Sequence, residues 1–99
     1  MHTLSNYRLK KTASVISTVE VAGLTFDILK SRFSVVDQYY VVIGWRDLPP
    51  QSRIVPIAHI NKTRSGKSIV VAWQPERFSA TEDDLNNLIK IIENLDANI

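Results

Sequence analysis

Residues 79–99 read SATEDDLNNLIKIIENLDANI, and this stretch determines how the rest of the chain is interpreted. Its large apolar side chains recur at alternating spacings of three and four residues, which is the spacing of an amphipathic helix. They are Leu85, Leu88, Ile92, Leu95 and Ile99. The pattern therefore predicts a helix over residues 79–97. Such a helix gains most of its stability by packing its apolar face against another element.

The two ends of this stretch refine the prediction. Near its start, a hydroxyl followed three residues later by a carboxylate fits a capping box, in either of two registers: Ser79 with Glu82, or Thr81 with Asp84. Ile89 and Ile91 mark the edges of an apolar arc roughly 160° wide, which is broad for a helix lying on one side of a sheet. Asp96 falls inside that arc, so we expect the ordered helix to fray near Leu95.

The segments before the helix are typical of β-strands. Ala13–Val21 alternates between apolar and polar residues and is rich in β-branched side chains. Ala22-Gly23 interrupts this run and indicates a hairpin turn. Leu24–Lys30 alternates as well, but Leu29 breaks the pattern and leaves a short helix over residues 24–32 as an alternative.

The strongest strand pattern covers Tyr39–Trp45, where both faces are apolar. Alternation places Tyr39, Val41, Ile43 and Trp45 on one face and Tyr40, Val42 and Gly44 on the other. A strand with two apolar faces is expected at the centre of a sheet, covered on both sides. The C-terminal helix can cover one side, and another element must cover the second.

The remaining segments complete a sheet. Ile54–Ile60 and Ser68–Trp73 form a predicted hairpin around a polar turn, and Pro56 indicates an edge position or a bulge in the first of them. Residues 1–12 are polar and basic, and we expect either a mobile arm or a short edge strand. No helix separates the strands over residues 13–73, which disfavours parallel winding.

These elements predict a protein of the α+β class. We expect an antiparallel, meander-like sheet of about five strands, with one C-terminal amphipathic helix packed on a face. The length of 99 residues corresponds to a single domain over residues 1–99.

Composition limits the functional classes. The apolar content of 44% and the charged content of 22% are ordinary for a globular protein. There is no cysteine, so disulfides and cysteine chemistry are excluded, and we expect a cytoplasmic protein. The longest apolar runs are far shorter than a membrane span, so we expect no membrane partner. The net charge of +2 conceals an asymmetry: residues 1–75 carry ten Lys and Arg against four Asp and Glu, whereas residues 76–99 carry two against six.

Two groups of side chains are candidate binding sites. Basic residues on or near the predicted hairpin are candidates for contacting nucleic-acid phosphates: Arg53, Lys62, Arg64 and Lys67. Aromatic residues of the predicted central strands are candidates for a ligand pocket between helix and sheet: Tyr39, Trp45 and Trp73. The alternatives are a solvated turn in the first case and ordinary core packing in the second.

The sequence contains no set of residues with the spacing of a catalytic or metal site. The two histidines, His2 and His59, lack a second ligand at metal spacing, and the carboxylates before residue 76 are scattered singly. We therefore expect no catalytic residues, no metal and no cofactor. The prediction is a small non-enzymatic interaction protein that forms a homodimer or binds another protein. The alternatives are a nucleic-acid-binding module that uses the basic hairpin tip, and a small-ligand pocket between helix and sheet.

Overall fold

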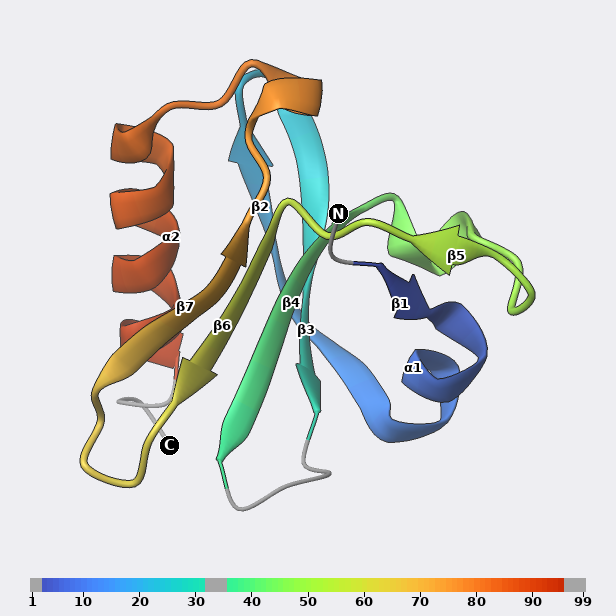
Figure 1. Cartoon of the computed structure of the whole chain (residues 1–99), viewed down its shortest axis with the longest axis horizontal. Helices are drawn as coiled ribbons and strands as arrows, with labels where there is room; N and C mark the ends of the chain where they lie inside the picture. The colour runs from blue at the N-terminus through green and yellow to red at the C-terminus, as the bar shows by residue number, and fades with distance from the viewer. Residues whose placement is uncertain (1–2, 32–35, 96–99) are drawn as a thin grey trace.

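The computed structural model describes residues 3–31 and 36–95 and has the predicted α+β architecture (Figure 1). A five-stranded antiparallel sheet has the strand order β2-β3-β4-β6-β7. Helix α2 (Glu82–Leu95) packs on one face of this sheet. The strands follow one another along the chain as a meander: β2 (Ala13–Val21), β3 (Leu24–Ser31), β4 (Asp37–Ile43), β6 (Ala58–Lys62) and β7 (Ser68–Trp73). The predicted fold class is confirmed.

Helix α2 covers its face of the sheet with a set of side chains that we call the α2-side core. The fully packed members are Val21, Phe26, Ile28, Tyr39, Val41, Ile57, Ala58, Ile60, Leu88 and Ile92. The remaining apolar residues of α2 pack against this core while staying partly exposed: Leu85, Ile89, Ile91 and Leu95. The broad apolar arc of the helix is therefore accounted for by the chain's own sheet.

A capping box starts α2 in the second of the two predicted registers. The backbone N–H of Thr81 donates to Asp84 Oδ2 at 2.8 Å, and the backbone N–H of Asp84 approaches Thr81 Oγ1 at 3.4 Å. Ser79 lies outside the helix with a φ of 54°. The predicted fraying around Asp96 concerns residues beyond those that the structure describes.

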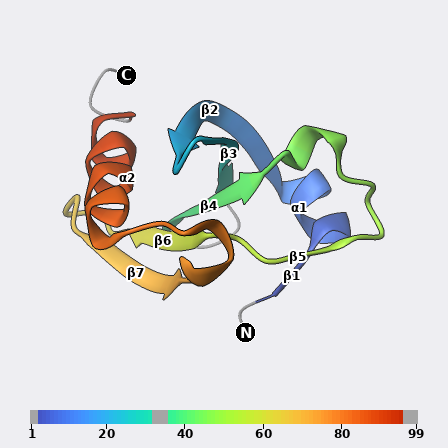
Figure 2. The same cartoon turned by 90° about the horizontal axis from the view of Figure 1, so that it is seen from above.

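A second layer covers the opposite face of the sheet, as the two-sided apolar pattern of β4 requires (Figure 2). It contains α1 (Asn6–Thr12), the two-stranded sheet of β1 (Leu4–Ser5) and β5 (Arg53–Ile54), and the 3-10 helix η1 (Trp45–Asp47). A further 3-10 helix, η2 (Glu76–Phe78), precedes α2. The buried residues between this layer and the sheet form the α1-side core: Leu9, Leu29, Tyr40, Val42, Trp45 and Ile54.

The prediction for residues 1–12 was wrong over most of its length. Only Leu4–Ser5 form a strand, and Asn6–Thr12 form helix α1. Seven residues are too few to show a helical period, and the two that are buried are Asn6 and Leu9. Because one of these is polar, the buried face of α1 does not register as an apolar pattern.

Strand β4 ends earlier than predicted, and this moves Trp45 to the other side of the sheet. Gly44 has a φ of 57° and lies before η1. A left-handed residue of this kind breaks the alternation of a strand. Trp45 therefore joins Tyr40 and Val42 in the α1-side core, rather than Tyr39 and Val41 in the α2-side core.

Strands β2 and β3 form the predicted hairpin, which excludes the alternative of a helix over residues 24–32. Its two turn residues, Ala22 and Gly23, have φ values of 51° and 80°, as a type I′ turn requires. Leu29 pairs with Val15 and packs in the α1-side core. The residue that breaks the sequence pattern of β3 thus packs against the second layer.

The predicted strand over residues 54–60 is interrupted at its proline. Arg53–Ile54 pair with β1, whereas the segment from Ala58 pairs with β4 and β7. Pro56 is buried between these two strands and cannot donate a backbone hydrogen bond to either neighbour. The predicted single strand is therefore two strands in two different sheets.

Candidate functional site

Strand β7 forms one edge of the five-stranded sheet and exposes a run of apolar side chains. Ile69 is 50% exposed, Val70 is 39% exposed and Val71 is 45% exposed. These are three of the five exposed large apolar side chains in the described part of the chain, and the other two are Tyr7 and Leu24. The edge therefore presents an apolar strip within Ser68–Trp73, a segment that contains no charged residue.

A bulge explains why three consecutive residues are exposed. Val70 pairs with Ile60 and Ala72 pairs with His59, so Val71 is an extra residue on β7. A bulge of this kind breaks the alternation of side chains between the two faces. Neither α2 nor the α1 layer can then cover the whole strip.

The turn between β6 and β7 has the predicted form, with Gly66 at a φ of 85°. The backbone N–H of Thr63 donates to the carbonyl of Lys67 at 2.9 Å, and the N–H of Gly66 donates to the carbonyl of Thr63 at 2.9 Å. Arg64 and Lys67 are both exposed on this turn. The turn therefore presents two cations to solvent.

The other two candidate basic residues have different surroundings. Lys62 Nζ donates to the carbonyl of Glu93 in α2 at 3.3 Å, so this side chain helps to fasten the hairpin to the helix. Arg53 lies in β5 opposite Ser5, in the second sheet and away from the turn (Figure 1). The predicted basic patch is thus split, and Arg53 does not belong to the hairpin tip because Pro56 separates β5 from β6.

The three candidate aromatic residues do not line a common pocket. Tyr39 is fully buried in the α2-side core, and Trp73 packs against that core while partly exposed. Trp45 is buried on the opposite face of the sheet. Core packing, the alternative considered from the sequence, describes Tyr39 and Trp45.

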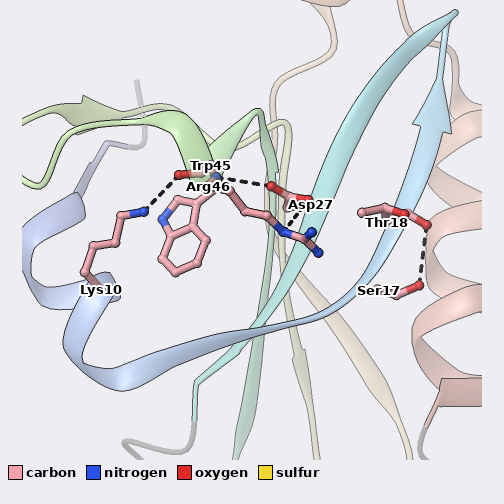
Figure 3. A network of polar contacts seen from close by, with 6 residues as sticks. All are labelled: Lys10, Ser17, Thr18, Asp27, Trp45 and Arg46. Carbon is pink, nitrogen blue, oxygen red and sulfur yellow. Dashed lines mark hydrogen bonds and ion pairs between the residues drawn. The ribbon is translucent and has the colours of Figure 1, made fainter.

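A polar network fixes Trp45 in place. Its ring Nε1–H donates to Asn6 Oδ1 at 2.7 Å, and its carbonyl accepts from Lys10 Nζ at 3.1 Å. The Lys10 ammonium also lies 4.1 Å from the centroid of the Trp45 ring. The next residue of η1 is tied to β3, because the backbone N–H of Arg46 donates to Asp27 Oδ2 at 3.3 Å (Figure 3). Helix α1, η1 and β3 are thereby joined.

Asn6 is the centre of the contacts that hold α1 to the loop after η1. Its Nδ2 donates to the carbonyl of Pro49 at 2.9 Å and approaches that of Leu48 at 3.4 Å. Its backbone N–H donates to the carbonyl of Ser52 at 3.3 Å. Asn6 is fully buried, and its amide is therefore used in structural hydrogen bonds rather than offered to a ligand.

A cavity of about 450 Å³ lies between α1, β1 and the sheet. Arg8 and Leu9 of α1, Ser31 of β3, and Gln38 and Tyr40 of β4 contribute to its wall. The Tyr40 hydroxyl donates to Gln38 Oε1 at 2.6 Å, and burial raises the pKa of this hydroxyl above its ordinary value. The cavity is on the opposite side of the sheet from the predicted ligand pocket.

Sequence reasoning missed this cavity and the strip on β7 for different reasons. The sequence indicates only that Arg8 is one cation of a polar segment, because it does not predict α1 and so cannot place Arg8 beside the sheet. Ile69 to Val71 were correctly assigned to a strand, but strand order decides which strands are edges, and a bulge decides which side chains stay exposed. Neither feature has a local signal in the sequence.

Within residues 3–31 and 36–95, no three His, Cys, Asp or Glu side chains are grouped as metal ligands, and His2 lies outside these ranges. Over the same residues, no helix is both long enough and apolar enough to cross a membrane. Comparison of the chain with protein-family models, with curated proteins and with solved structures gave no match.

Proposed function

We propose that this chain is a small non-enzymatic interaction protein that binds a second copy of itself along β7. The observation that carries this proposal is the exposed run of Ile69, Val70 and Val71 on a sheet edge. Pairing of two such edges would join the two sheets into one of ten strands. Edge pairing of this kind is a common way in which β-proteins associate.

The wide apolar arc of α2 and the two apolar faces of β4 were the first reasons to expect a homodimer. Both are now accounted for within the chain, since α2 packs on its own sheet and the α1 layer covers the second face of β4. The support for self-association therefore comes from β7 alone, where apolar side chains and an open backbone edge coincide.

The sequence of β7 favours a second copy as the partner. A twofold axis at Val70 would set Val70 opposite its own equivalent and Ile69 opposite Val71, so apolar residues meet across the interface. In the same register Lys67 would lie opposite Trp73, a favourable pairing of a cation with an aromatic ring. No like charges face one another within Ser68–Trp73, so nothing in the strip opposes pairing with itself.

The bulge at Val71 limits the number of regular hydrogen bonds that the two edges can form. We therefore expect a reversible dimer at micromolar to millimolar protein rather than a permanent one. Sedimentation equilibrium of the full chain from about 10 µM to about 1 mM, a range that brackets binding free energies of roughly 4–7 kcal/mol, would measure this. A monomer at every concentration would refute the proposal.

Ile69→Lys is the most informative variant, because Ile69 is the most exposed residue of the strip and a charge on an edge opposes pairing. Leu24→Lys is its matched control, since Leu24 is 41% exposed on β3. We expect Ile69→Lys to weaken the dimer by at least about tenfold, a change of roughly 1.4 kcal/mol, and Leu24→Lys to leave it unchanged. Equal effects of the two variants would mean that the contact does not involve β7.

A further inference from the structure

The cavity between α1 and the sheet has the size and the mixed lining of a small-molecule site. Its volume of about 450 Å³ falls within the range of roughly 300–1,000 Å³ that is usual for such sites. Leu4 and Leu9 contribute apolar surface, and Ser31, Gln38 and Tyr40 contribute polar groups from the floor of the sheet. One wall is therefore suited to an apolar body and the other to hydrogen bonds.

The electrostatics of the cavity favour negative charge. Arg8 is the one charged side chain among the described residues that line it. Helix α1 also carries Lys10 and Lys11 and contains no acidic residue. Neither lysine lines the cavity, so a ligand with a negative charge would meet Arg8 as the cation at the wall, with no carboxylate of the described lining to repel it.

The polar groups on the floor do not oppose this preference. The Tyr40 hydroxyl is held by its hydrogen bond to Gln38 Oε1 at 2.6 Å. Burial raises the pKa of the Tyr40 hydroxyl, so the phenol stays protonated at neutral pH and adds no negative charge. Ser31 is almost fully buried beside these residues and brings a hydroxyl that donates or accepts.

We propose that this cavity binds a small organic anion, a carboxylate or a phosphate ester attached to a short apolar body. The planar guanidinium of Arg8 pairs with the anionic group through two parallel hydrogen bonds, a geometry that suits both kinds of anion. The apolar body lies against Leu4 and Leu9. The site is separate from the β7 edge, and its test does not depend on whether the chain forms dimers.

A probe series with one ring and different head groups tests the proposal without altering the protein. Benzoate and phenyl phosphate supply the anion, benzamide the matched neutral group, and benzylamine the matched cation. Each is titrated into the full-length chain labelled with ¹⁵N, and amide shifts are followed by NMR. We expect saturable shifts at Leu9, Ser31 and Tyr40 with at least one anion, and at least about tenfold weaker binding of benzamide and benzylamine, as loss of a charge-assisted hydrogen bond implies.

Arg8→Gln removes the cation from the wall, and Lys11→Gln removes the same charge from an exposed position on the same helix. We expect the first to weaken anion binding by at least about tenfold and the second by less than about twofold. Unchanged thermal midpoints would show that both variants are folded. The proposal is overturned if benzamide binds as well as the anions, if the two variants weaken binding equally, or if neither anion binds at about 10 mM.

Discussion

Replacing Asn6 by alanine should destabilise the protein far more than its position in a polar N-terminal segment implies. The substitution removes the acceptor of the Trp45 Nε1–H and the donor to the Pro49 carbonyl. The hydrogen bond from Trp45 is buried, and so is the space that the amide leaves. Water therefore cannot readily replace the acceptor of the Trp45 Nε1–H, whereas the hydrogen bond to the Pro49 carbonyl is only partly buried.

The magnitude follows from these two contacts. A buried donor or acceptor that loses its partner costs about 1–3 kcal/mol. The buried Trp45 Nε1–H therefore contributes about 1–3 kcal/mol and the part-buried hydrogen bond to the Pro49 carbonyl about 0.5–1.5 kcal/mol. Together they give a loss of about 1.5–4.5 kcal/mol in the free energy of unfolding. The 3.4 Å approach to the Leu48 carbonyl is too long to add much. For a domain of this size, each kcal/mol lowers the thermal midpoint by about 4–8 °C.

Urea denaturation followed by tryptophan fluorescence and circular dichroism measures this loss. Asn86→Ala is the matched control, because Asn86 is exposed on α2 and alanine is the better helix former. We expect Asn86→Ala to change stability by less than about 0.5 kcal/mol. A loss below about 0.5 kcal/mol for Asn6→Ala would show that the α1 layer does not depend on this amide, and would refute the reasoning.

Two further predictions concern the helix and the basic turn. Ile92→Asp should unfold the chain, because it places a charge in the α2-side core without a partner. Lys90→Ala, on the exposed side of α2, should change stability by less than about 0.5 kcal/mol. An unchanged thermal midpoint for Ile92→Asp would contradict the packing of α2. At about 0.1 M salt, where charges are screened over about 10 Å, the two exposed cations Arg64 and Lys67 should give no measurable binding of labelled single- or double-stranded oligonucleotides. Binding that weakens with salt and is lost on replacing both residues by alanine would restore the nucleic-acid alternative.

The parts of the fold that were predictable are those with a local periodic signal. The spacing of Leu88 and Ile92 predicts α2, and the alternation around Ala22-Gly23 predicts the β2–β3 hairpin. In each case the residues that define the pattern also make the contacts, so the element can be predicted from its own stretch of sequence. The overall class and the meander follow because short connections leave antiparallel neighbours as the simplest arrangement.

The parts that were not predictable depend on contacts between distant residues or on one backbone angle. Asn6 and Trp45 meet across 39 positions of the chain, and α1 has no apolar period that would reveal its buried side. Trp45 lies on the unexpected face because Gly44 alone turns the chain at the end of β4. The proposed anion site shares this limitation, since Arg8 comes to line the cavity only because α1 lies over the sheet.

The two edges of the five-stranded sheet provide an internal comparison that bears on the proposed dimer. Both edge strands contain a bulge, so irregular backbone does not distinguish them. They differ in what they expose: β2 presents only polar side chains among its exposed residues, which are Ser14, Thr18 and Glu20, whereas β7 exposes Ile69, Val70 and Val71. Polar and charged side chains are a common means of keeping an edge unpaired. Because the same chain has this composition on β2 and lacks it on β7, the comparison supports β7 as the edge that pairs.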